Sequence, residues 1–105
     1  MDVTGGELAP DVWTWLQGWY TAQCDGLWEH SYGVAIDTID NPGWSLRIDL
    51  ADTSLHGKAY ERSENHRGEH DWVVTWIADA QFQAACGPLN LSEALSRFRE
   101  WARHV

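Results

Sequence analysis

The sequence predicts an α+β fold in which an antiparallel sheet of four to five strands, arranged as a meander, carries an N-terminal and a C-terminal helix on one face. Two observations predict it. Apolar residues recur at helical spacing near both ends of the chain, and they alternate with polar residues in the short segments between. The 105 residues suit one domain. We expect a flexible N-terminal arm at 1–9, which has little to bury, and a single α+β domain at 10–105.

The first helix and a β-hairpin are expected in the first half of the chain. Asp11 is a candidate N-cap for a helix at about 11–23, and four apolar residues follow at helical spacing: Val12, Trp15, Leu16 and Trp19. Alternating strands at 32–37 and 44–50 then flank "DNPGW" (40–44). Pro42 sets φ for a turn, and Gly43 would supply the positive φ of a type II turn.

The second half is expected to complete the sheet. A weak strand covers about 57–62, and "SENHRGEHD" (63–71) has no apolar residue, which predicts an exposed loop. "WVVTWIA" (72–78) is apolar on both faces and favours a central strand, and another strand follows the Asp79–Ala80 turn as far as Cys86. Asn90 and Glu93 resemble a capping box before a final amphipathic helix. Its apolar stripe has six residues: Leu91, Ala94, Leu95, Phe98, Trp101 and Ala102.

The chain holds eight tryptophans. Four lie on apolar stripes and are expected in the core: Trp15, Trp19, Trp76 and Trp101. Trp28 and Trp44 flank loops rich in acidic residues and Asn, which is the composition of an interface hot spot. Trp44 could also simply begin the inward face of its strand.

The charge is negative and uneven. The net charge is −9, and residues 1–57 hold nine carboxylates against one base, Arg47. Such a half repels nucleic acid and anionic membranes and attracts a basic protein, although the charge could also serve solubility alone. No apolar run approaches the ~20 residues of a membrane span. Without a secretory signal the chain is expected in the cytoplasm, where Cys24 and Cys86 would remain thiols.

The side chains of the sequence allow three kinds of chemical site. Cys24, His30 and a carboxylate from Asp25 or Glu29 could form a nucleophilic site, but no cysteine-hydrolase signature surrounds them, which favours an incidental thiol. The Asp25 and Glu29 pair could also serve glycoside cleavage, although no substrate groove is indicated. His56, His66 and His70 could hold a metal, but their segment is a solvated loop in this interpretation. Phosphate-binding glycine motifs are absent from the sequence.

The stretch "QCDGLWEHSYGVAIDTIDNPGWSLRIDL" (23–50) resembles the signature of immunity protein family 53 of bacterial polymorphic toxin systems. The resemblance lies in CDG-x-WEH-x-YG, in T-[LI]-DNPGW and in a strand ending in IDL. Three flanking features extend it over about 12–101: "WYTAQC", a "DW" strand and a "FREW" helix. Leu27 departs from the pattern, which has a polar residue there, often Asp. This weakens any polar role for position 27.

The resemblance implies a small intracellular protein that binds and neutralises a cognate toxin domain, without catalysis or cofactor. Many such toxins are basic nucleases, which would suit the acidic first half. No nucleic acid or membrane partner is expected, and the protein would be a monomer or weak homodimer. We expect the toxin-binding surface in the 25–32 loop, the 40–44 turn and the strand between them: Asp25, Trp28, Glu29, His30, Tyr32, Asp37, Asp40, Asn41 and Trp44.

Two alternatives remain open at this point. The chain could be a small thiol- or carboxylate-dependent hydrolase that uses Cys24, His30 and Glu29. The WEH and DNPGW motifs could instead preserve the fold, with the partner contacted elsewhere, for example through residues 63–71.

Overall fold

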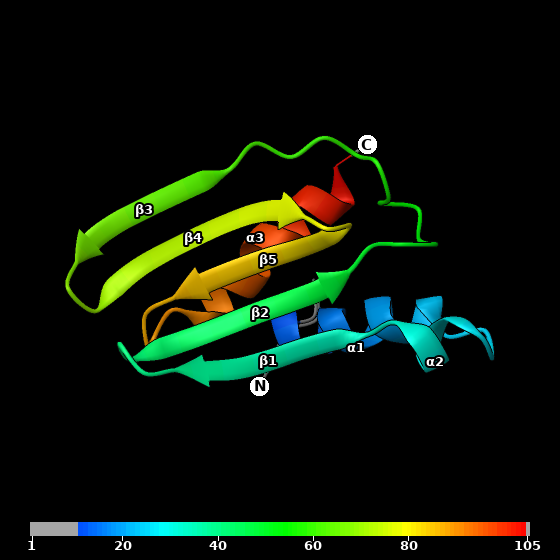
Figure 1. Ribbon diagram of the computed structural model, residues 1–105, viewed down its shortest axis with the longest axis horizontal. Helices are drawn as coiled ribbons and strands as arrows, with labels where there is room; N and C mark the ends of the chain where they lie inside the picture. The colour runs from blue at the N-terminus through cyan, green and yellow to red at the C-terminus, as the bar shows by residue number, and fades with distance from the viewer. Residues whose placement is uncertain (1–10, 105) are drawn as a thin grey trace, which may run out of the picture.

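A five-stranded antiparallel sheet carries helices on one face, as the ribbon shows (Figure 1). The computed structural model describes residues 11–104. The elements are α1 (Val12–Gln23), α2 (Trp28–Ser31), β1 (Val34–Ile39), β2 (Gly43–Asp49), β3 (Ser63–Gly68), β4 (Asp71–Ala78), β5 (Gln81–Cys86) and α3 (Leu91–Arg103). The predicted α+β class is confirmed. The predicted arm, residues 1–9, lies outside the described residues.

The strands follow the order β1-β2-β5-β4-β3, so the sheet is not a simple meander. After β2, residues 50–62 carry the chain to the far edge, and β3, β4 and β5 return as a meander until β5 pairs with β2. Buried Leu50 and Leu55 anchor this connection to the core. The strand predicted at 57–62 is therefore wrong, because this stretch forms part of the connection.

The core lies between the sheet and the layer formed by α1 and α3. Phe82 on β5 and Phe98 on α3 are fully buried, with ring centroids 5.1 Å apart. Trp15 and Trp19 of α1 and Trp101 of α3 pack edge-on or stacked against these rings, as their apolar stripes predicted. Each large ring removes roughly 150–250 Å² from water, so a few aromatics stabilise a short chain.

The segment 63–71 forms β3, a turn and the start of β4, where an exposed loop was predicted. The prediction is wrong because it took the absence of apolar residues as evidence against a strand. This edge strand is held by backbone pairing with β4 and by Arg97 of α3, which donates to Ser63 and Asn65. Arg67 adds bonds to Asp71 and Glu93, and these bonds lower the pKa of both carboxyl groups.

The structure tests the predicted N-terminal caps of α1 and α3 and the predicted position of the 72–78 strand. Asp11 caps α1 as expected, because its carboxylate accepts the Thr14 N–H at 2.8 Å. Asn90 makes no capping bond to α3. Its side chain instead joins α3 to β4, accepting the Trp72 N–H and donating to Asp71. The strand predicted at 72–78 is an interior strand, although the middle of the sheet is β5.

Gly43 does not have the positive φ that a type II turn requires, so that prediction is wrong. The residue is needed for a different reason. It is buried in β2 beside the end of β5, and a Cβ at this position would lie 2.1 Å from the carbonyl oxygen of Cys86. Cys86 is itself buried, which raises the pKa of its thiol. Backbone contact at the β2–β5 junction therefore excludes every side chain at position 43.

We predict that Gly43→Ala lowers the free energy of unfolding by about 3 kcal/mol, because the added methyl group must push β2 away from β5. Urea denaturation followed by tryptophan fluorescence measures this change. Gly18→Ala is the matched control, since a Cβ there meets nothing within 4 Å and α1 should gain about 0.5–1 kcal/mol. Equal stability of the two variants would contradict the close-approach explanation.

Candidate functional site

The motif at 24–33 shapes the turn between α1 and α2. Glu29 accepts the backbone N–H groups of Asp25 and Gly26 at 3.0 and 2.9 Å. Asp25 accepts the N–H groups of Trp28 and Leu27, which lower the pKa of its carboxyl group. Gly26 provides the positive φ, 94°, on which the turn depends. The carboxylates that suggested chemistry are thus bonded to local backbone.

The aromatic residues of the two predicted patches face inward. Trp28 is 4% exposed, its indole N–H donates to Ala51 O at 2.9 Å, and Tyr32 packs against its ring. Trp44 is half-buried against the core, and its indole N–H donates to Pro88 O. Neither ring offers a partner a broad exposed surface.

The structure does not gather the nine predicted site residues into one patch. Asp25, Glu29, His30 and Tyr32 lie around α2, whereas Asp40 and Asn41 lie at the opposite end of β1, roughly 20 Å away along a six-residue strand (Figure 1). Asp25, His30, Asp37, Asp40 and Asn41 are exposed. Leu27, the departure from the family pattern, is 77% exposed. Whether these exposed residues contact a partner stays a prediction.

The side chains that the sequence offered for catalysis or metal binding form bonds to other groups. The thiol of Cys24 donates to the Tyr20 carbonyl at 3.4 Å, and Glu29 is bonded to backbone, so neither is directed at His30. His66 approaches Glu64 at 3.2 Å and stacks on Trp72. Between residues 11 and 104, no group of three or more His, Cys, Asp and Glu side chains is arranged to hold a metal ion.

One face of the sheet carries no described helix, and we call it the open face (Figure 1). Pairing with the core residues Phe82 and Cys86 places Ile77 and Val73 of β4 on the helix side. Strand alternation then puts Trp72, Val74 and Trp76 on the open face. Trp76 was predicted in the core, and that prediction is wrong. A strand that is apolar on both faces, in a sheet covered on one side, must leave one apolar row outside.

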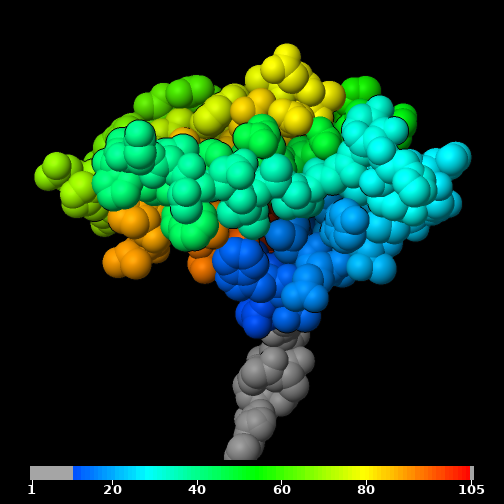
Figure 2. Space-filling model, turned by 60° about the horizontal axis from the view of Figure 1, so that its bottom comes forward, coloured from blue at the N-terminus to red at the C-terminus, as the bar shows by residue number. Residues whose placement is uncertain are grey.

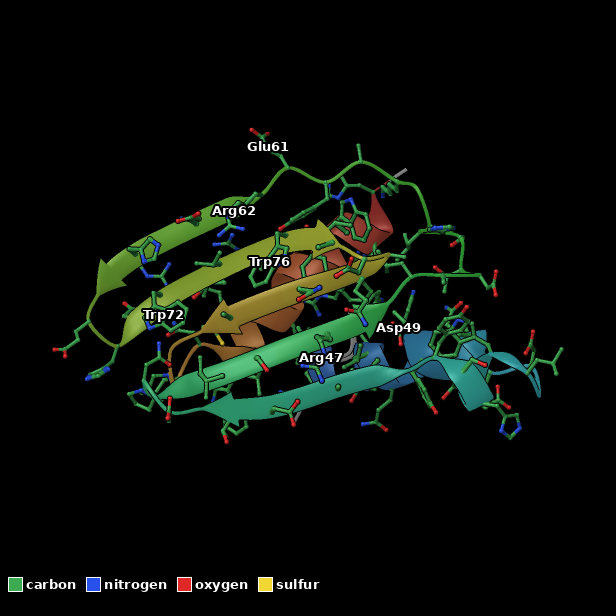
Figure 3. All side chains as sticks on the ribbon, viewed as in Figure 1. Arg47, Asp49, Glu61, Arg62, Trp72 and Trp76 are labelled. Atoms are coloured by element: carbon green, nitrogen blue, oxygen red, sulfur yellow. The ribbon has the colours of Figure 1, made fainter. Side chains whose placement is uncertain are left out.

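The aromatic half of the open face packs against side chains of the neighbouring segment, Arg62 and His66. The Arg62 guanidinium lies 5.2 Å from the Trp76 ring centroid, and the His66 ring stacks on Trp72 at 6.5 Å and 13°. Glu64 accepts from both Arg62 and His66, and Arg62 in particular lowers the pKa of its carboxyl group. Figure 3 shows Arg62 beside Trp76, above the neighbouring strand.

The other half of the open face, on β1, β2 and β5, is polar. Arg47 contacts Asp37 at 3.3 Å, and the Gln81 side chain donates to Asp49 at 2.9 Å. Asp49 also accepts the N–H of Gly33. Arg47 and Asp49 lie side by side along β2 (Figure 3). The open face therefore combines a tryptophan pair with a polar surface of both charge signs.

The comparisons with known proteins identify the family. The family model described as immunity protein 53 matches residues 13–103. The chain belongs to this family. Membership assigns a toxin-neutralising immunity role, in which the protein binds a cognate toxin, and it suggests a non-enzymatic role. No curated protein and no solved structure shows significant similarity to the chain. In the part that the structure describes, no helix has the length and apolarity to cross a membrane.

We predict that Glu29→Ala lowers the free energy of unfolding of this immunity protein by about 1–2 kcal/mol, because two backbone N–H groups lose their acceptor. His30→Ala, at the exposed neighbouring position, should change it by less than about 0.5 kcal/mol. Urea titrations of both variants measure the difference. A neutral Glu29→Ala would show that the carboxylate does not support this turn.

Proposed function

We propose that the chain neutralises the toxin of a polymorphic toxin system in the cytoplasm of the producing cell, and that the toxin docks on the open face. The observation that carries the proposal is the pair Trp72 and Trp76, which lie on the one sheet face without a described helix. Trp and Arg dominate the residues that contribute most binding energy at protein interfaces. A role in binding requires such a surface.

The tryptophan pair is suited to act as an anchor. Two residues four apart on one strand lie roughly 13 Å apart and point the same way, so one partner surface could contact both. Each ring already rests against a neighbour, Arg62 for Trp76 and His66 for Trp72. Prior ordering reduces the conformational entropy lost when the toxin binds. The ring faces are flat and apolar, and polar side chains surround them.

The toxin that we propose is basic, as a nuclease would be. The chain carries a net charge of −9, and Asp37 and Asp40 stand exposed at the β1 side of the open face. Opposite charges speed encounter between partners and suppress wrong ones. The predicted residues Asp25 and His30 would then lie at one end of this surface, with Asp40 and Asn41 at the other. These residues would contact the toxin at the rim of the interface and would speed its association.

We predict that Trp76→Ala weakens binding of the cognate toxin by about 30-fold, or ~2 kcal/mol, as removal of a central aromatic anchor does. Isothermal titration calorimetry gives the affinity, and growth during toxin co-expression shows protection. Trp13→Ala is the matched control, because Trp13 is 40% exposed but lies on α1, away from the open face. Full protection and unchanged affinity with Trp76→Ala would remove the open face from the proposal.

We also predict that Asp40→Lys slows toxin association by about 3–10-fold at low salt and by much less at 0.5 M salt, because screening removes the long-range attraction. Stopped-flow fluorescence measures the association rate. Glu100→Lys reverses the same charge at an exposed position of α3, on the helix side, and should have a smaller effect. If both charge reversals slowed association equally, the rate would depend on the net charge of the chain and not on the position of Asp40.

A further inference from the structure

The two edges of the sheet are protected to different degrees. β3 consists of "SENHRG", has a register shift between His66 and Gly68, and is tied to α3 through Arg97. Charges and irregularity are the usual means by which an edge strand avoids pairing with another chain. β1 consists of "VAIDTI", pairs in unbroken register over six residues, and carries one charged side chain, Asp37. β1 is therefore the edge open to a further strand.

The backbone groups that β1 presents can be derived from its pairing. Gly33 accepts the N–H of Asp49, so the Gly33 backbone carbonyl points toward β2. In an antiparallel pair the direction alternates, so Ala35 and Asp37 also bond β2. The N–H and C=O groups of Val34, Ile36 and Thr38 then point to the free edge. Figure 2 shows β1 as a teal band along the front of the molecule, above α1.

A hollow lies on each side of the start of β1. On the helix side, a hollow of about 330 Å³ is lined by Leu16, Gln17, Tyr20, Gly33 and Val34. On the open face, a second hollow of about 270 Å³ is lined by residues of β1, β2 and β5, among them Ala35, Arg47 and Asp49. Both hollows are lined by Gly33 and Val34. The helix-side hollow lies beside the β1 backbone, within reach of a side chain on an added strand, whereas the open-face hollow extends inward over β2 and β5.

We propose that the free edge of β1 binds an extended segment of the cognate toxin by strand addition. The inference rests on the proposed function and deepens it by naming the mode of contact. The toxin residue opposite Val34 points to the helix side and places an apolar side chain in the hollow beside Leu16 and Tyr20. The next toxin residues point to the open face, where a Lys or Arg meets Asp37. The added strand extends the sheet beyond β1, and the body of the toxin lies against the open face, as in the proposed function.

The chemistry of the edge favours a toxin segment over a second copy of this chain. In the antiparallel pairing of two β1 strands centred on Ile36, which joins the outward-facing residues of both copies, Thr38 of one copy lies opposite Val34 of the other. A threonine is too small and polar to fill the apolar hollow there. Two copies would also bring together two chains of net charge −9 with exposed Asp37 and Asp40 at the contact. A basic segment with an apolar residue matches both features.

The decisive variant is Thr38→Pro. It removes an N–H that points away from β2 and places the proline ring at the free edge, so β1–β2 pairing is preserved while strand addition is blocked. We expect toxin affinity to fall at least ~10-fold, with the melting temperature close to that of the parent chain. Thr38→Ala is the matched control because it keeps the N–H, and its affinity should stay within ~2-fold. Equal affinities for a folded Thr38→Pro and Thr38→Ala would overturn the proposal.

Hydrogen exchange on the unaltered chain tests the inference even if Thr38→Pro does not fold. The amides of Val34, Ile36 and Thr38 should exchange readily in the free protein and become protected when toxin binds. Toxin binding without this protection overturns strand addition and leaves the proposed function standing. Protection in the free protein also overturns it: a dimeric mass would identify a second copy, and a monomeric mass would identify another segment of this chain. If the unaltered chain fails to bind the toxin at all, the proposed function itself is wrong.

Discussion

The pairing of β2 with β5 joins the two halves of this protein. β2 belongs to the hairpin that follows α1 and α2, and β5 belongs to the meander that precedes α3. Six residue pairs connect them, from Trp44 with Cys86 to Asp49 with Gln81. At one end the backbones approach so closely that position 43 has no room for a side chain. Because the chain crosses from β2 to the far edge before returning, this pairing also determines which strands become edges.

The described helices cover only one face of the sheet. Both long helices pack on the same side of the sheet, and α1 contacts α3 directly within this layer. β4 is apolar on both sides, so its helix-side residues are buried while Trp72 and Trp76 remain on the open face. Arg62 and His66 pack against these rings, which remain partly exposed, while Val74 between them is buried. An immunity protein must offer its toxin a surface, and one-sided helix packing leaves this surface available.

The motif at 24–33 shows why a family signature need not mark a binding site. Asp25 and Glu29 together accept four backbone N–H groups of the turn, and the Trp28 indole N–H donates to Ala51 O in the connection after β2. Together they hold the end of α1 against the start of β1. The stretch thereby positions Gly33 and Val34, which line both hollows at the edge where we propose that a toxin strand binds.

The sequence by itself determined the two long helices, the hairpin and the interior strands, because helical spacing and alternation are local signals of burial on one face. It did not determine α2, which lies where a loop was predicted. It also carried the family signature, which the family match confirms. It did not determine β3, whose polar residues are held by β4 and Arg97, nor the side on which Trp76 lies. Those outcomes depend on strand order and on which face the helices cover. Both follow from contacts between residues far apart in the chain, and only the tertiary structure decided them.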